Sequence, residues 1–259
     1  MKKYFICSDV HGFFTIFKKS LEKEGFDIKN KEHILIVCGD LFDRGEEAVE
    51  CYKFVKKLSK QKRLIYIKGN HEDLLFDCVE ELKKYDGCAS SHHYSNGTVN
   101  TVVQFMKENI LDEVLEFIKK NTVDYYELGK YIFVHSYIPT TNNKKVPYLS
   151  EGITYKYNPE WRKASKEEWE NARWGNPFEI YNQSVYEKDK IIVCGHFHTS
   201  WAHYNIEHSI PKEFPDRKDE ENFEKAFKPI YFDNLIGIDA CTEYSGIINI
   251  LVLDNEEIK

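Results

Sequence analysis

The chain has 259 residues, with 36 Lys and Arg against 43 Asp and Glu, and therefore a formal net charge of -7. This acidic balance argues against a broad nucleic-acid-binding surface, which needs clustered positive charge, so we expect no nucleic-acid partner. No apolar run approaches the about 18 residues of a membrane helix, and the seven cysteines include no Cys-x-x-Cys pair. The sequence predicts a cytoplasmic protein without a membrane partner.

Five short apolar runs each end in a cluster of Asp, His or Asn. In chain order they read KKYFICS before DVHG, HILIVC before GDLFDRG, RLIYI before KGNHE, KYIFV before HS, and KIIVC before GHFH. We expect each run to be a buried strand. In open α/β sheets, ligand sites form outside the carboxyl ends of the strands, so the polar residues should converge on one rim. They are Asp9, His11, Asp40, Asn70, His135, His196 and His198.

Helical patterns alternate with these strands, which favours an α/β fold. Apolar spacing predicts helices over 13–21 and 48–58, and two or three helical stretches over 72–121. Within the last region, DGCASSHHYSNG is expected to be a polar loop in which His92 and His93 are solvated, with a lid over the site as the alternative.

The remaining elements complete one expected domain over residues 1–259. Ser165 followed by Glu168 is a capping-box pattern before a short helix. YYELGKYIFVHS is typical of a hairpin, and SGIINILVL of a strand. We expect a helical and loop insertion over about 72–122 and a charged excursion over about 205–229.

The converging side chains offer O and N donors and no thiolate, which suits Mn, Fe, Zn or Mg. Asp40 is the expected bridge between two ions, because it has two oxygens and belongs to the richest cluster. Asp9 and His11 would hold the first ion, with His198 as a further ligand; the alternative for His198 is a hydrogen bond to a neighbouring group. The expected ligands of the second ion are Asn70, His135 and His196.

The spacing of these clusters resembles that of the calcineurin-like metallophosphoesterases. The chain reads Asp-x-His from Asp9, Gly-Asp-x-x-Asp-Arg-Gly from Gly39, Gly-Asn-His-Glu from Gly69, a lone His135 and then Gly-His at His196. The Asp-Arg-Gly form is similar to the phosphoprotein phosphatase branch, whose bacterial members include Ser/Thr protein phosphatases and symmetrical dinucleoside tetraphosphatases. The tail NLIGIDACTEYSG resembles the family's closing strands, so the resemblance covers almost the whole chain.

The resemblance implies a four-layer αββα sandwich of two mixed sheets and two divalent metal ions, Mn2+ being the first expectation. Two cations about 3.5–4 Å apart would activate a shared water toward phosphorus. Arg44 would neutralise charge on the phosphate oxygens as a bidentate fork. His71 would protonate the leaving alkoxide, with Asp43 orienting its ring and favouring the charged form.

Substrate contacts are expected from Asn70, Arg173 and Tyr244. Asn176 stands where the family usually has an Arg after Trp, and Arg173, just before Trp174, is the candidate to replace it; a structural Arg is the alternative. Tyr244 matches the family's phosphate-side tyrosine, with core packing as its alternative.

These residues and the resemblance predict a hydrolase of phosphoric monoesters, and in particular a Ser/Thr protein phosphatase, acting on a phosphorylated protein or a small phosphoester. The enzymatic alternative is a symmetrical dinucleoside polyphosphate hydrolase or a phosphodiesterase that uses the same metals. A non-catalytic metal-binding scaffold is the alternative from another class, although a scaffold has no need of a general acid.

Overall fold

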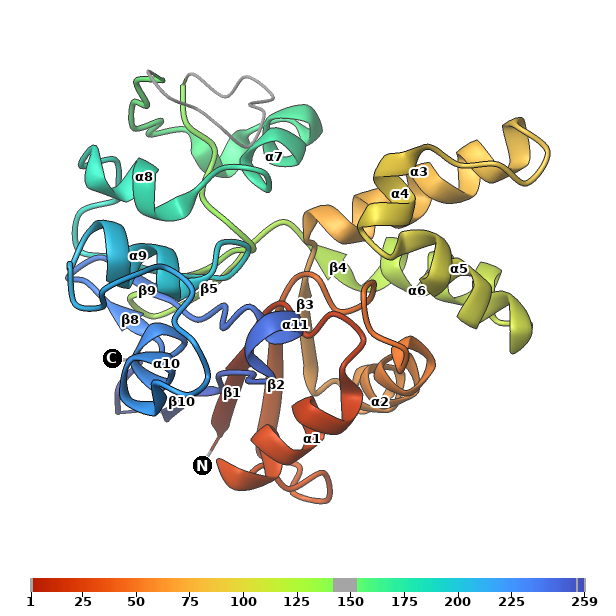
Figure 1. The fold of residues 1–259 in the computed structure, drawn as a ribbon, viewed down its shortest axis with the longest axis horizontal. Coiled ribbons are helices and arrows are strands. Elements are labelled where there is room, and N and C mark those ends of the chain that lie inside the picture. The colour runs from red at the N-terminus through yellow and green to blue at the C-terminus, as the bar shows by residue number, and fades with distance from the viewer. Residues whose placement is uncertain (1, 142–152, 255, 259) are drawn as a thin grey trace.

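The computed structural model describes residues 2–141, 153–254 and 256–258 (Figure 1). All five apolar runs form strands, as the sequence predicts. They are β1 (Lys3–Cys7), β2 (His33–Cys38), β3 (Leu64–Ile67), β6 (Tyr131–Phe133) and β7 (Ile191–Cys194). Each strand ends shortly before its cluster of polar residues.

The strands belong to two five-stranded sheets. The first has the order β10-β1-β2-β3-β4, where β4 is Thr122–Val123 and β10 is Leu251–Asp254, and only β10 runs antiparallel to its neighbour. The second has the order β5-β6-β7-β9-β8, where β5 is Tyr126–Leu128, β8 is Ile230–Tyr231 and β9 is Leu235–Gly237. The expected hairpin joins β5 and β6, and β8 is antiparallel to β9, so both sheets are mixed.

The side chains of β1 explain why the molecule has four layers. Successive side chains of a strand point to opposite faces of a sheet. Phe5 and Cys7 pack among the helices on one face, whereas Tyr4 and Ile6 pack in a second cluster with Phe133 of the other sheet. Burial on both faces accounts for an unbroken apolar run instead of a polar and apolar alternation. The predicted αββα sandwich is confirmed.

Helices cover the outer faces of the two sheets (Figure 1). On the first sheet lie α1 (Phe14–Lys23) and α2 (Ala48–Lys60), close to their predicted ranges. On the second lie α7 (Lys166–Ala172), α8 (Pro177–Asn182) and α9 (Thr199–Asn205). The predicted capping box at Ser165 and Glu168 is present at the start of α7. The remaining short helices outside the region after β3 and the charged excursion are a 3-10 turn, Trp161–Lys163, and α11, Thr242–Ser245.

The region after β3 forms a helical arm that stands beside the first sheet (Figure 1). It contains α3 (Asn70–Lys84), α4 (Ser91–Ser95), α5 (Thr98–Lys107) and α6 (Leu111–Asn121). The prediction of a polar loop over DGCASSHHYSNG is wrong at α4, where His93 is buried while His92 stays exposed. The turn into α5 needs Gly97, since its φ is +76° and a Cβ there would lie 2.5 Å from the backbone nitrogen of Arg44.

The charged excursion after α9 is also more ordered than its sequence suggests. It contains α10 (Glu220–Ala226), which the Asp219 side chain caps by accepting from the backbone N–H of Asn222. Phe227 and Ala226 anchor the excursion in a small cluster with Ala240. Among the residues described, no helix combines the length and the apolar character needed to cross a membrane.

Candidate metal centre

The backbone at the predicted site is unusual, because six residues with predicted metal-binding or catalytic roles have left-handed φ angles. The angles lie between 49° and 68°, a region that non-glycine residues seldom adopt. These residues are Asp9, His11, Asp40, Asp43, Arg44 and His196. Tight turns directly after β1, β2 and β7 therefore aim the side chains at a common point, and such local strain is concentrated at functional sites.

Two donor groups meet at Asp40, and every member is buried except His196, which is half-buried. In the first, donor atoms of His11, Asp40 and His71 all lie within 4.8 Å of one another; in the second, the same holds for Asp40, His135 and His196. The Asp40 Oδ2 atom lies 3.8 Å from His11 Nε2 and 3.4 Å from His135 Nε2. Asp40 is thus the common member of both groups.

Asp9 and Asn70 extend these two groups. Asp9 Oδ1 lies 3.8 Å from His11 Nε2, and Asn70 Oδ1 lies 2.7 Å from His135 Nε2. The other oxygen of Asp9, Oδ2, accepts a hydrogen bond from the backbone N–H of His196 at 2.9 Å, which ties the ends of β1 and β7 together. Of the seven residues predicted as ligands, the structure brings six to one place.

The pKa shifts of the Asp and His side chains at the centre are those expected of a site for cations. Burial raises the pKa of Asp9 and Asp40 well above the usual range, and neighbouring carboxylates raise both further. Burial also lowers the pKa of His11 and His135, and takes that of His196 to about 3. Neutral imidazoles beside crowded carboxylates are the ligand forms that divalent metals bind, so the donor set fits two such ions.

Backbone carbonyl groups orient two of the imidazoles. His11 Nδ1 lies 3.1 Å from the Phe42 carbonyl oxygen, and His135 Nδ1 lies 2.8 Å from that of Cys38. Each contact fixes the ring so that Nε2 faces Asp40, the arrangement usual for metal-binding histidines.

His71 and Asp43 form a hydrogen-bonded pair at the edge of the centre. His71 Nδ1 lies 2.8 Å from Asp43 Oδ2, and Thr98 donates to the same oxygen at 2.8 Å. The backbone N–H of Asp43 donates to Thr101 Oγ1 at 3.0 Å. Both threonines belong to α5, so the helical arm holds the pair in place.

Arg44 lies beside the centre, whereas Arg173 is engaged elsewhere. Arg44 Nε is 3.8 Å from Glu243 Oε2, and the guanidinium charge adds to the burial that lowers the pKa of His11. Arg173 is buried, donates to Asp73 at 2.8 Å and also pairs with Asp124. It therefore joins the helical arm to the segment between the two sheets.

Three other residues that the sequence singled out have partners of their own. The side chain of Asn176 caps α8 by accepting from the backbone N–H of Phe178. Tyr244 donates through its hydroxyl to the Pro215 carbonyl oxygen at 3.1 Å. His198 lies outside both donor groups, with Nδ1 2.8 Å from Ser200 Oγ and Nε2 3.3 Å from a Glu213 oxygen.

Glu72 and Asp239 were not assigned from the sequence. The buried Glu72 carboxylate accepts from the backbone N–H groups of Asp40, Leu41 and Gly69, and from the Tyr66 hydroxyl at 2.7 Å. In the sequence, only the position of Glu72 in the Gly-Asn-His-Glu motif indicates a role for this residue. Burial raises the pKa of Asp239 to about 6, and its charge raises that of Asp9. The Asp239 carboxylate therefore adds to the negative charge that bound cations would offset.

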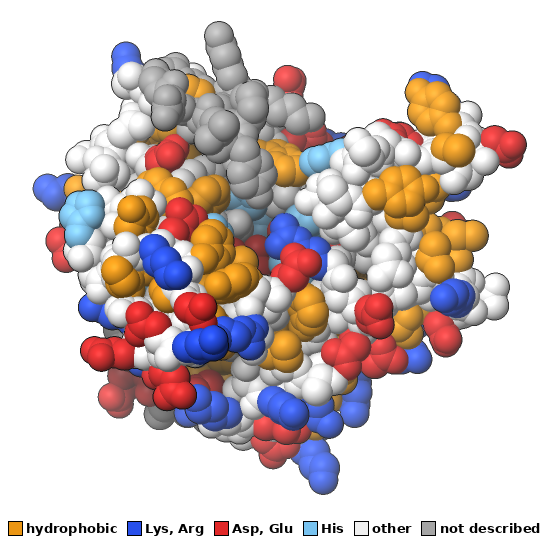
Figure 2. Space-filling model, viewed as in Figure 1, with side chains coloured by type: hydrophobic (Ala, Val, Ile, Leu, Met, Phe, Trp, Pro, Cys, Tyr) orange, Lys and Arg blue, Asp and Glu red, His pale blue; other side chains and the backbone are white. Residues whose placement is uncertain are grey.

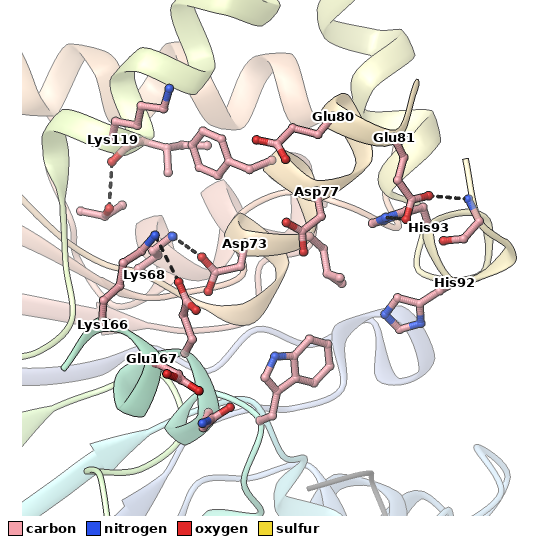
Figure 3. A pocket seen from close by; sticks show the side chains of 18 of the residues that line it. Lys68, Asp73, Asp77, Glu80, Glu81, His92, His93, Lys119, Lys166 and Glu167 are labelled. Carbon is pink, nitrogen blue, oxygen red and sulfur yellow. Dashed lines mark hydrogen bonds and ion pairs between the residues drawn. The ribbon is translucent and has the colours of Figure 1, made fainter. Parts of the chain in front are cut away.

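A cleft of about 1930 Å3 opens beside the centre, between the helical arm and α7. Its walls carry many charges, with Asp73, Asp77, Glu80 and Glu81 on α3 and Lys166 and Glu167 on α7 (Figure 3). Trp174 lines the cleft, and its ring centroid lies 6.2 Å from that of His196. The cleft therefore adjoins the second donor group.

Comparisons with known proteins agree with this geometry. A symmetrical bis(5'-nucleosyl)-tetraphosphatase of Actinobacillus succinogenes is 40% identical over 85 residues, 32% of this chain and 29% of the relative. One of Buchnera aphidicola subsp. Schizaphis graminum is 26% identical over 186 residues, 72% of this chain and 57% of the relative. The chain thus spans 57% or less of these relatives.

A solved structure and a family model extend the comparison over more of the chain. A cold-active protein-tyrosine phosphatase of Shewanella has a TM-score of 0.53 at 13% identity, covering 98% of this chain and 76% of that one, which shows a shared fold. A family model described as calcineurin-like phosphoesterase matches residues 2–236. With that match over most of its length, and with its two donor groups meeting at Asp40, the chain belongs to the calcineurin-like phosphoesterase family.

Proposed function

We propose that the protein is a two-metal-dependent phosphoester hydrolase whose preferred substrates are small phosphoesters, with dinucleoside polyphosphates first among them. The observation that carries this proposal is the pair of donor groups that share the buried Asp40. The relatives named as bis(5'-nucleosyl)-tetraphosphatases support the substrate class. They favour what the sequence alone offered as the alternative to a protein phosphatase.

The ligands divide between two ions around Asp40. Asp9 and His11 would hold one ion, and the other would be held by Asn70, His135 and His196. When bound, the two ions would neutralise phosphate charge and lower the pKa of a water molecule. Mn2+ is the first ion to test, followed by Fe, Zn and Mg.

The chain's own side chains would position the substrate and supply a proton. Arg44 borders the centre with a side chain 26% exposed, and a guanidinium can bind two phosphate oxygens at once. His71, oriented by Asp43, would donate a proton from Nε2 to a leaving oxygen. Because Asp43 is fully buried, the orientation of this ring is fixed before substrate binds.

A second candidate substrate is a phosphomonoester, including phosphoserine or phosphothreonine in a protein. The His71 and Asp43 pair favours it, because an alkoxide leaves only with a proton, whereas a nucleotide phosphate leaves readily without one. Dinucleoside polyphosphates, phosphomonoesters and phosphodiesters should therefore be compared on the same metal-loaded preparation.

The test combines that substrate panel, with metals supplied one at a time, and the Asp40→Asn variant. We expect Asp40→Asn to lose nearly all turnover and part of its bound metal, since both donor groups lose a charge. Asp233→Asn, at an exposed position, is the matched control. Wild-type activity with full metal content in Asp40→Asn would refute the two-metal proposal. Metal binding without turnover of any ester would favour the scaffold alternative.

A further inference from the structure

A row of aromatic rings leads from the metal centre to the protein surface. The ring centroids of His196 and Phe197 are 6.4 Å apart, and those of Phe197 and His198 are 5.3 Å apart. From His198 the row continues to Phe214 at 4.8 Å and to Tyr244 at 5.0 Å. Its inner end is a predicted metal ligand, and its outer end lies on the charged excursion and on α11.

The outer end of this row is exposed although its rings are large. Phe214 and Tyr244 are each 39% exposed, and Phe214 is the one Phe among the exposed large apolar residues of the described chain. Figure 2 shows histidine side chains in a hollow near the middle of the molecule, with hydrophobic side chains gathered along one rim. An exposed aromatic group beside a reaction centre is a feature that substrate binding explains.

The exposed rings are held in place by their neighbours. The Tyr244 hydroxyl donates to the Pro215 carbonyl oxygen, and the Tyr244 carbonyl oxygen accepts from Arg217 at 2.5 Å. Phe227, buried behind them, lies 5.7 Å from Tyr244 and 6.4 Å from Phe214. The surface is thus preorganised, which reduces the entropy that a ligand loses on binding.

Arg44, the proposed phosphate-binding residue, links this aromatic surface to the metal centre. The Nε atom of Arg44 lies 3.8 Å from an oxygen of Glu243, the residue next to Tyr244. Arg44 thus borders the metal centre and also lies next to α11, the helix that carries Tyr244. A phosphate bound at Arg44 would carry its organic substituent toward Phe214.

We propose that Phe214, with Tyr244 beside it, forms a stacking surface for the base of a nucleoside phosphate whose phosphate groups lie at the metal centre. This inference rests on the proposed function and assigns the part of the site that recognises the nucleoside. A flat heteroaromatic base fits an exposed ring because stacking requires only a π-face. Since the Tyr244 hydroxyl is already bonded to Pro215, the surface should discriminate little between different bases.

The test measures binding without turnover. Titration calorimetry on the metal-loaded full chain compares the hydrolysis-resistant methylenephosphonate analogue of adenosine 5'-monophosphate with that of ribose 5-phosphate, which carries the same phosphonate but no base. We expect wild type to bind the nucleotide about tenfold more tightly, since base stacking on an aromatic side chain has an effect of that order. Phe214→Leu should remove most of this ratio, and Phe214→Trp should restore it. Tyr204→Leu, at a tyrosine 40% exposed on α9, is the control.

Equal affinities of wild type for the two ligands overturn the proposal, and so does a ratio that Phe214→Leu leaves intact. A dimer in sedimentation that Phe214→Leu dissociates also overturns it, because a second copy would then cover the surface. The outcome is separate from that of the proposed function. Selective nucleotide binding without hydrolysis of dinucleoside polyphosphates would support this inference and refute the proposed substrate. Hydrolysis of dinucleoside polyphosphates without selective nucleotide binding would refute this inference and support the proposed substrate.

Discussion

His71 and Asp43 are joined by a hydrogen bond of 2.8 Å that depends on a helix far along the chain. Thr98, at the start of α5, donates to the same Asp43 oxygen, and Thr101 one turn later accepts from the Asp43 backbone. The helical arm therefore holds the proposed proton donor and its partner in place. Gly97 allows the close approach, since any Cβ there would meet the backbone of Arg44.

The first prediction separates proton donation by His71 from metal binding. His71→Asn should lower turnover of an alkyl phosphate by about 10²–10⁴-fold, because the alkoxide leaves only with a proton. Turnover of nitrophenyl phosphate should fall far less, since nitrophenolate leaves without one. Because His71 also belongs to the first donor group, metal content must be measured in parallel. Equal losses on both esters at full metal content would show that His71 is no proton donor.

The second prediction concerns Glu72, which holds two ligand loops together. Glu72→Gln places an amide NH2 group against backbone N–H donors, so we expect a loss of about 3 kcal/mol in the free energy of unfolding and weaker metal binding. Glu80→Gln, at an exposed position of the same helix, should change neither. Denaturant unfolding and metal titration measure both effects. A variant as stable as Glu80→Gln would show that this carboxylate is dispensable.

The fold was largely predictable because a strand that is buried on both faces appears in the sequence as an unbroken apolar run. Phe5 must pack on helices and Tyr4 on the other sheet, so every buried residue of such a strand is apolar and the run is visible in the sequence. By contrast, α4 has few apolar residues; it is recognisable only from the packing that buries His93.

The candidate site was predictable where its donor residues directly follow strands, and less so where residues far apart in the sequence meet. Asp40 and His135 each come within two residues of a strand end, and the packing of the two sheets against each other brings these strand ends together. The partners of Arg173 are 100 and 49 positions away, and no local pattern indicates them. Asp239 lies beside Asp9 only because β9 is inserted next to β7, which is a property of the tertiary fold.

The third prediction separates a structural role of Arg173 from phosphate binding. Arg173→Met leaves Asp73 and Asp124 without their shared cation, so we expect a loss of about 2 kcal/mol in the free energy of unfolding with little change in KM. The aspartates keep some solvent exposure, which limits the loss. Lys166→Met, with its side chain 83% exposed, is the control. A raised KM at unchanged stability would instead support the phosphate contact that the sequence suggested.

The last prediction tests His198 as a metal ligand. Residues two apart on an extended segment can point the same way, and this spacing led to the expectation that His196 and His198 both face the metals. In the structure the two nitrogens of His198 contact Ser200 and Glu213, and its ring packs on Phe214. We therefore expect His198→Ala to retain both metal ions in elemental analysis, as the exposed control His208→Ala should, whereas His196→Ala should lose the second. Selective loss of one ion from His198→Ala would instead establish it as a ligand, with its ring turning toward Asp9 when metal binds.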